Sequence, residues 1–97
     1  MATQWDLLVL HPDDDVAVAL RDLPEGDARL RGGGCITLGA GVPLGHKVAL
    51  HAIRRGAVIR KYGAAIGEAT DDIAAGAHVH VHNLRSLRAR RNEGESR

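Results

Sequence analysis

The clearest pattern of hydrophobic and polar residues lies near the end of the chain, from Ala77 to Asn83. The run alternates strictly between small apolar residues and histidines, which is typical of a half-buried β-strand. Successive side chains of a strand point to opposite faces, so the apolar residues share one face and the histidines the other. The first face consists of Ala77, Val79 and Val81, and the second of His78, His80 and His82. Three imidazoles contribute little to a core, so the histidine face is the first candidate for function.

Shorter apolar runs predict further strands at residues 5–10, 35–38, 58–63 and 65–70. The run 16–20 is ambiguous, because a helix capped by Asp13 or Asp14 is an alternative, but its β-branched residues favour an extended segment. The acidic run 13–15 before it is interpreted as a solvated turn rather than a cation site. Many short strands without a convincing long helix predict a compact all-β domain, either a barrel or a folded-over β-structure.

Three segments share one form, in which an aliphatic residue is followed by two turn-compatible residues and a glycine. They are Asp22–Gly26, Ala52–Gly56 and Asp72–Gly76. Glycine supplies a positive φ without a Cβ penalty, and a strand-like run follows each segment within a few residues. We therefore expect three equivalent connectors that lead the chain into strands. Residues 32–34, all glycine, are interpreted as a hairpin tip, because no helix follows them to form a phosphate-binding loop.

Composition limits the classes of function. The 97 residues predict one domain at residues 1–87, followed by a polar, disordered tail at residues 88–97. Thirteen basic and 12 acidic residues give a net charge of +1, which argues against binding to nucleic acid or to an anionic membrane. Cys35 is the only cysteine, so no internal disulfide forms. Without a signal peptide or an apolar run of spanning length, the sequence predicts a cytoplasmic protein.

Four stretches, taken in order, resemble one known family: His11–Leu20, Val42–Leu50, Lys61–Thr70 and Gly76–Asn83. Together they are similar to the small N-terminal domain of the altronate/galactarate dehydratase family, which also occurs alone as the alpha subunit of sulfolactate sulfo-lyase. The resemblance covers about residues 5 to 84 and implies a SAF domain with the β-clip fold. The family usually has Asn where this chain has Asp15, and Asp where this chain has Ala52. These two differences are compatible with an altered substrate.

The resemblance also implies a lyase, which removes water from a sugar acid or sulfite from sulfolactate by β-elimination. This chemistry needs a base for the proton next to the carboxylate, stabilisation of an enediolate, and help for the leaving group. The resemblance implies a catalytic role for His80 and His82, as base, metal ligand or carboxylate contact. The expected substrate-binding residues are His46, Lys47, His78 and Asn83. His11 and His51 are interpreted as ordinary surface or turn residues.

Family members join this domain to a much larger domain or subunit, which these residues do not contain. The chain is therefore expected to be inactive alone, to need a large partner subunit, and to close over a small hydroxy-acid substrate. A divalent metal (Fe, Mn or Mg) is possible and is expected mainly on the partner, because no Cys or carboxylate lies at ligand spacing beside the histidines. A homo-oligomer is also possible. The alternative function is a non-enzymatic module that binds a sugar acid or a protein partner.

Overall fold

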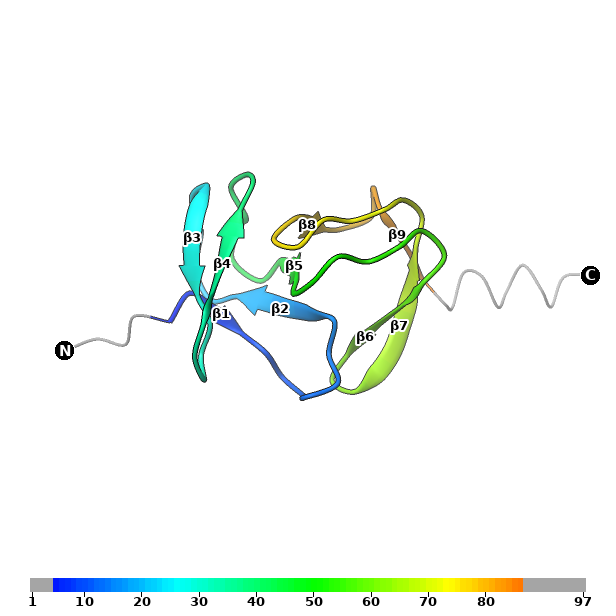
Figure 1. The fold of residues 1–97 in the computed structure, drawn as a ribbon, viewed down its shortest axis with the longest axis horizontal. Helices are drawn as coiled ribbons and strands as arrows, with labels where there is room; N and C mark the ends of the chain where they lie inside the picture. The colour runs from blue at the N-terminus through cyan, green and yellow to red at the C-terminus, as the bar shows by residue number, and fades with distance from the viewer. Residues whose placement is uncertain (1–4, 87–97) are drawn as a thin grey trace, which may run out of the picture.

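The computed structural model describes residues 5–86, which form nine short strands and no helix. The strands are β1 (Leu7–Leu8), β2 (Val16–Ala19), β3 (Gly26–Arg29), β4 (Cys35–Leu38), β5 (Lys47–Ala49), β6 (Val58–Lys61), β7 (Ala64–Ala69), β8 (His78–Val79) and β9 (Leu84–Ser86) (Figure 1). The prediction of an all-β domain is confirmed. Within this range no helix is long and apolar enough to cross a membrane. The tail predicted at residues 88–97 lies outside the described residues.

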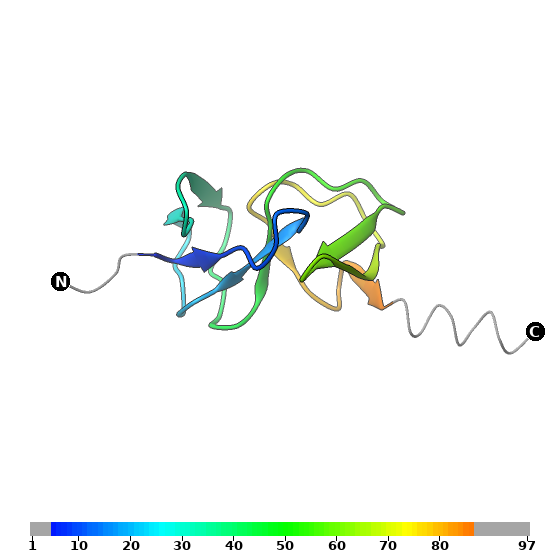
Figure 2. The same cartoon turned by 90° about the horizontal axis from the view of Figure 1, so that it is seen from below.

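The strands form three antiparallel sheets. A four-stranded sheet has the order β1-β2-β5-β8, a two-stranded sheet pairs β3 with β4, and a three-stranded sheet has the order β6-β7-β9. The two smaller sheets lie at opposite ends of the molecule, with the four-stranded sheet between them (Figures 1 and 2). The four-stranded sheet therefore contacts apolar side chains on both of its faces.

The hydrophobic core consists of two clusters that meet at β2 and β5. Val16 and Ala49 belong to the cluster that packs on the β6-β7-β9 sheet, whereas Ala17 and Val48 belong to the cluster that packs on the β3-β4 hairpin. Neighbouring residues of a strand point to opposite faces, so both faces of β2 are buried. Burial on both faces explains the lack of alternation in the run 16–20, which is a strand over Val16–Ala19.

The three predicted connectors are confirmed, and the structure adds a fourth at residues 41–45. Each contains one residue in an isolated β-bridge, and the bridges pair Leu23 with Val42 and Ile53 with Ile73. Both pairs also carry the same side-chain contact: Asp22 accepts a hydrogen bond from the Leu44 N–H at 2.8 Å, and Asp72 accepts one from the Arg55 N–H at 2.8 Å. The two halves of the domain thus use one turn design twice.

The predicted strand from Ala77 to Asn83 is confirmed only at His78 and Val79. β8 contains only His78 and Val79, the chain bends at His80, and residues 81–83 form a turn. Val81 is 81% exposed and therefore does not share the buried face of Val79. The Asn83 N–H donates to the His80 carbonyl at 3.0 Å, which closes the turn and reverses the chain into β9.

The acidic run before β2 also differs from its interpretation as a solvated turn. Asp14 is buried, and its carboxylate accepts hydrogen bonds from the Tyr62 N–H at 3.0 Å and the Gly63 N–H at 2.7 Å. Both residues have positive φ, at 58° and 74°, and form the two-residue turn of the β6-β7 hairpin. Asp14 therefore ties the start of β2 to that hairpin.

Candidate functional site

Four histidine rings lie together beside β8, and we call them the histidine cluster. They are His46, His78, His80 and His82. Ring centroids are 5.0 Å apart for His46 and His78, 4.7 Å for His46 and His80, 5.4 Å for His78 and His80, and 5.7 Å for His78 and His82. The structure thus brings the predicted catalytic residues His80 and His82 together with the predicted substrate-binding residues His46 and His78.

The cluster is assembled from two parts of the chain. His46 lies between the fourth connector and β5, and His78 begins β8, which pairs with β5 in the register Val48–His78. His46 Nδ1 and His78 Nε2 are 2.8 Å apart and share a hydrogen bond. One nitrogen must donate and the other accept, so the bond is lost when both rings are fully protonated.

Asn83 shapes the turn that carries His80 and His82. Its Oδ1 accepts from the His80 N–H at 2.9 Å, and its Nδ2 donates to the His78 carbonyl at 2.9 Å. Asn83 is only 7% exposed. Both ends of its amide are thus committed to backbone groups on either side of Val79. Asn83 therefore stabilises the turn that carries His80 and His82.

Lys47 follows His46 directly, but its side chain belongs to the other face of the sheet. Residues directly opposite each other in an antiparallel pair share a face, so Lys47 shares one with Val18 and Val79. Burial lowers the pKa of the half-buried Lys47 ammonium, and repulsion from Lys61 lowers it further. The expected His46-Lys47 pair is therefore divided between the two faces.

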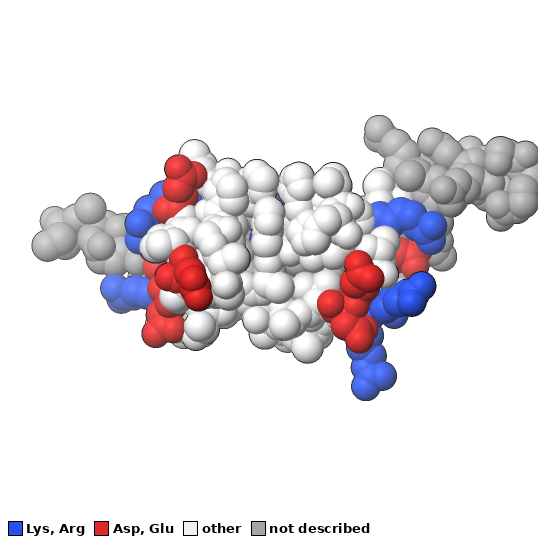
Figure 3. Space-filling view, turned by 90° about the horizontal axis from the view of Figure 1, so that it is seen from above, with Lys and Arg blue, Asp and Glu red and all other residues white. Residues whose placement is uncertain are grey.

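The electrostatic environment of the cluster is one-sided. Burial is the main cause that lowers the pKa of His78, and His46, His80, His82 and Lys47 lower it further by repulsion. All these neighbours are cationic when protonated, and no carboxylate acts on His78 among the residues that the structure describes. The charged side chains of the face seen in Figure 3 also gather toward the two ends of the molecule. These surroundings disfavour the protonated form of His78.

The residues present do not fit a metal site of their own. Across residues 5–86, no group of three or more His, Cys, Asp or Glu side chains is arranged to hold a metal ion. In addition, one nitrogen each of His46 and His78 is already used in their mutual hydrogen bond. The arrangement is suited instead to hydrogen bonding, proton transfer and binding of an anion.

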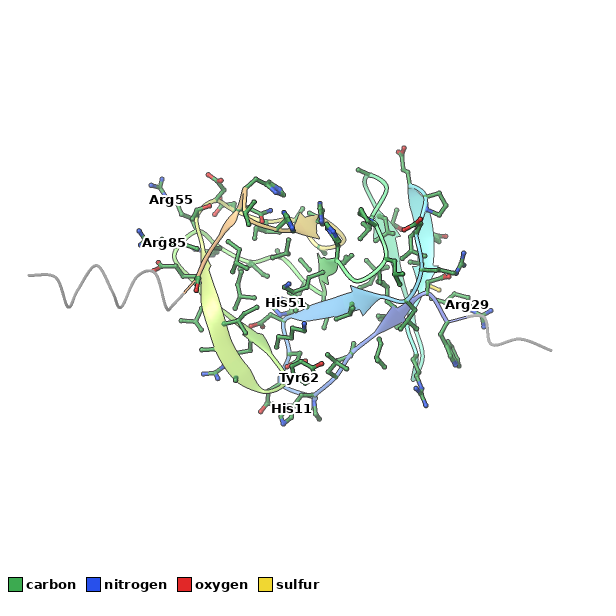
Figure 4. The ribbon with its side chains drawn as sticks, turned by 180° about the vertical axis from the view of Figure 1, so that it is seen from behind. His11, Arg29, His51, Arg55, Tyr62 and Arg85 are labelled. Carbon is green, nitrogen blue, oxygen red and sulfur yellow. The ribbon has the colours of Figure 1, made fainter. Side chains whose placement is uncertain are left out.

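The two remaining histidines lie outside the cluster. His51 Nε2 is 2.9 Å from an Asp15 carboxylate oxygen and its Nδ1 is 3.0 Å from the Ala52 carbonyl. Because both partners only accept, they favour the doubly protonated ring, and the Ala52 hydrogen bond is the main cause that raises the pKa of His51. His11 lies beside Tyr62 at the β6-β7 hairpin, at the opposite edge of the molecule from β8 (Figure 4). Neither ring belongs to the candidate site.

A hollow at the β6-β7-β9 end is lined by Arg55, Gly56, Glu68, Ala69, Thr70 and Arg85. Within it Arg85 is paired with Glu68 at 3.2 Å. Figure 4 places Arg55 and Arg85 beside each other at this end. The hollow contains no residue of the histidine cluster.

Comparison with known proteins gives the family of this chain. The family model for the altronate/galactarate dehydratase SAF domain matches residues 5–87. Over 77 residues the chain is 51% identical to the altronate dehydratase of Escherichia coli (strain K12) and 40% identical to that of Bacillus subtilis (strain 168). Each match covers 79% of this chain but only 16% of the dehydratase. The chain is also 43% identical over 53 residues to the (2R)-sulfolactate sulfo-lyase subunit alpha of Paracoccus pantotrophus. That match covers 55% of this chain and 79% of that subunit. The chain therefore belongs to the altronate/galactarate dehydratase SAF-domain family.

Proposed function

We propose that this chain supplies one wall of the active site of a lyase, and that a large partner subunit or domain supplies the other. The reaction is the β-elimination of water or sulfite from a hydroxy acid, such as a sugar acid or sulfolactate. Family membership and the names of the curated relatives support a dehydratase or sulfo-lyase. The small share of the altronate dehydratases that the chain covers supports the need for a partner.

The observation that carries this proposal is the histidine cluster. A hydroxy-acid lyase must hold a carboxylate, remove the proton beside it and protonate the leaving group, and imidazoles suit each task near neutral pH. His46 and His78, which are linked to each other, are proposed to bind the substrate carboxylate. His80 and His82 are proposed for proton transfer, since no hydrogen bond to their ring nitrogens is formed by any residue the structure describes.

The other predicted contacts take supporting places in this proposal. Lys47, on the opposite face of the sheet, contributes positive charge to the surroundings of His78 rather than a direct contact within the cluster. Asn83 holds the turn and keeps its amide on the backbone. Any divalent metal (Fe, Mn or Mg) is proposed to belong to the partner, since residues 5–86 offer no group that fits one.

Reconstitution tests the proposal. The purified chain, a large partner chain co-purified from the native host, and their mixture are each assayed with sulfolactate, altronate and galactarate. We expect product only from the mixture. His80→Ala should then lower turnover strongly, while the matched change His11→Ala, outside the cluster, should leave it unchanged. Turnover by the partner alone at the rate of the mixture would contradict the proposed contribution of this chain. Binding of an acid without turnover, whatever the partner, would support a non-enzymatic binding module.

A further inference from the structure

The histidine cluster brings four titratable rings close together at one place on the molecule. Four rings lie within 5.7 Å of a neighbour, and Lys47 adds a further cation from the adjacent strand. Like charges at such distances disfavour each other in a partly buried site. The hydrogen bond between His46 and His78 also requires that at least one of its two nitrogens carries no proton.

The charged groups that act on His78 all have the same sign when protonated. His46 and Lys47 come from the start of β5 and the residue before it, and His80 and His82 come from the β8-β9 turn. No carboxylate from the described part of the chain offsets them at His78. An anionic ligand would therefore bring the missing negative charge itself.

We propose that the histidine cluster takes up protons from solution when an anion binds to it, so that its positive charge rises to offset the negative charge of the ligand. The proton moves from water or buffer to a free imidazole nitrogen, and the anion itself is unchanged. This inference deepens the proposed function, on which it rests for the identity of the natural ligand as a hydroxy acid. It assigns the loaded cluster a higher positive charge than the empty one.

Proton uptake makes binding depend on pH in a defined direction. For each proton that the cluster takes up on binding, the association constant of the anion falls by about tenfold for each unit of rising pH. The lowered pKa of His78 supports this direction, because its empty state resists protonation.

The test uses the full 97-residue chain, freed of metals with EDTA, and inorganic sulfate as the probe. Sulfate stays a dianion throughout the range in which histidine titrates, so any pH dependence belongs to the protein. NMR titration of each histidine Cε1–H is carried out in sodium sulfate and in sodium chloride at equal ionic strength. We expect sulfate to raise the titration midpoints of His46, His78, His80 and His82 above their values in chloride, and to leave that of His11 unmoved. Equal midpoints in the two salts, or the same movement at His11, would overturn the inference.

A pair of variants localises the effect. His80→Gln, which removes one ring of the cluster, should weaken sulfate binding and flatten its pH dependence, as measured by calorimetry. His11→Gln should change neither quantity. If sulfate raises no midpoint while the reconstituted lyase still depends on His80, the inference fails and the proposed function stands. If sulfate raises the midpoints but no partner gives turnover, the inference stands and the proposed function fails.

Discussion

Nδ1 of His46 and Nε2 of His78 lie 2.8 Å apart, across 32 positions of the sequence. This hydrogen bond joins the residue before β5 to the start of β8 and fixes two rings of the cluster. With His80 stacked on His46 at 4.7 Å, it makes a compact group of imidazoles from residues that are distant in the chain. The catalytic proposal depends on this group rather than on a row of histidines along one strand.

The first prediction concerns acid stability and His78. Burial and cationic neighbours lower the pKa of this ring, so the folded state resists a proton that the unfolded chain accepts near its ordinary value of about 6.5. His78 therefore removes stability progressively as pH falls below about 6.5, and has no such effect above it. His78→Gln should lose less stability than the wild type between neutral and mildly acidic pH in urea unfolding. Parallel pH profiles for the two proteins would contradict this account, and His11→Gln serves as the control.

The second prediction compares the contributions of two neighbouring aspartates, Asp13 and Asp14, to the free energy of unfolding. Asp14→Ala leaves the Tyr62 and Gly63 N–H groups without their buried acceptor, at a cost of about 2 kcal/mol in the free energy of unfolding. Asp13, whose side chain is 75% exposed, is the matched control, and Asp13→Ala should change stability by no more than about 0.5 kcal/mol. Equal losses for the two variants in urea unfolding would show that Asp14 does not anchor the hairpin.

The third prediction compares two glycines with nearly equal φ, of which only Gly76 packs closely against the backbone of β4. A Cβ on Gly56 (φ 87°) meets no atom within 4 Å, whereas a Cβ on Gly76 (φ 82°) would lie 2.0 Å from the Thr37 carbonyl oxygen. Gly56→Ala should therefore cost only the strain of its positive φ, about 1 kcal/mol. Gly76→Ala adds a collision with the backbone of β4 and should cost more than about 3 kcal/mol or prevent folding. Thermal unfolding of both variants gives the comparison, and similar melting temperatures would contradict it.

The repeated turn design predicts a stabilising change. Asp22 and Asp72 each precede a bridge residue and accept a backbone N–H from the paired connector, and Ala52 occupies the equivalent place before Ile53. By that equivalence, Ala52→Asp should accept the Ala75 N–H and raise the free energy of unfolding by about 0.5–1 kcal/mol. Ala40→Asp, at another exposed alanine, is the control. A loss of stability in Ala52→Asp, or an equal gain in both variants, would contradict the equivalence.

The sequence predicted the features of this fold that local chemistry determines. Glycines that need a positive φ revealed three of the four connectors, and short apolar runs indicated an all-β domain. Alternation predicts too long a strand at β8, however, because the side-chain amide of Asn83 holds a turn through hydrogen bonds to the backbone of His78 and His80, which an apolar-polar pattern does not show. The interpretation of Asp14 as part of a solvated turn is wrong for a similar reason, since its partners Tyr62 and Gly63 lie 48 and 49 positions away.

The candidate site was foreseen in its residue types but not in its arrangement. The alternating histidines and the family resemblance pointed to the histidines of β8 and its turn, and His46 followed from the resemblance. The contact between His46 and His78 depends on the register of β5 against β8, which no local pattern determines. The same register turns Lys47 to the other face, so its neighbour in sequence is not its neighbour in the site.

The most direct test of the central claim is the turnover number of the reconstituted complex that carries His80→Ala and His82→Ala together. Proton transfer by a positioned side chain typically contributes a factor of about 10² to 10⁴ in rate. We expect kcat to fall by at least about 10² relative to the complex carrying His11→Ala, with the variant chain still folded and still bound to its partner. An unchanged kcat in that folded, assembled complex would contradict the claim that the histidine cluster forms part of the active site.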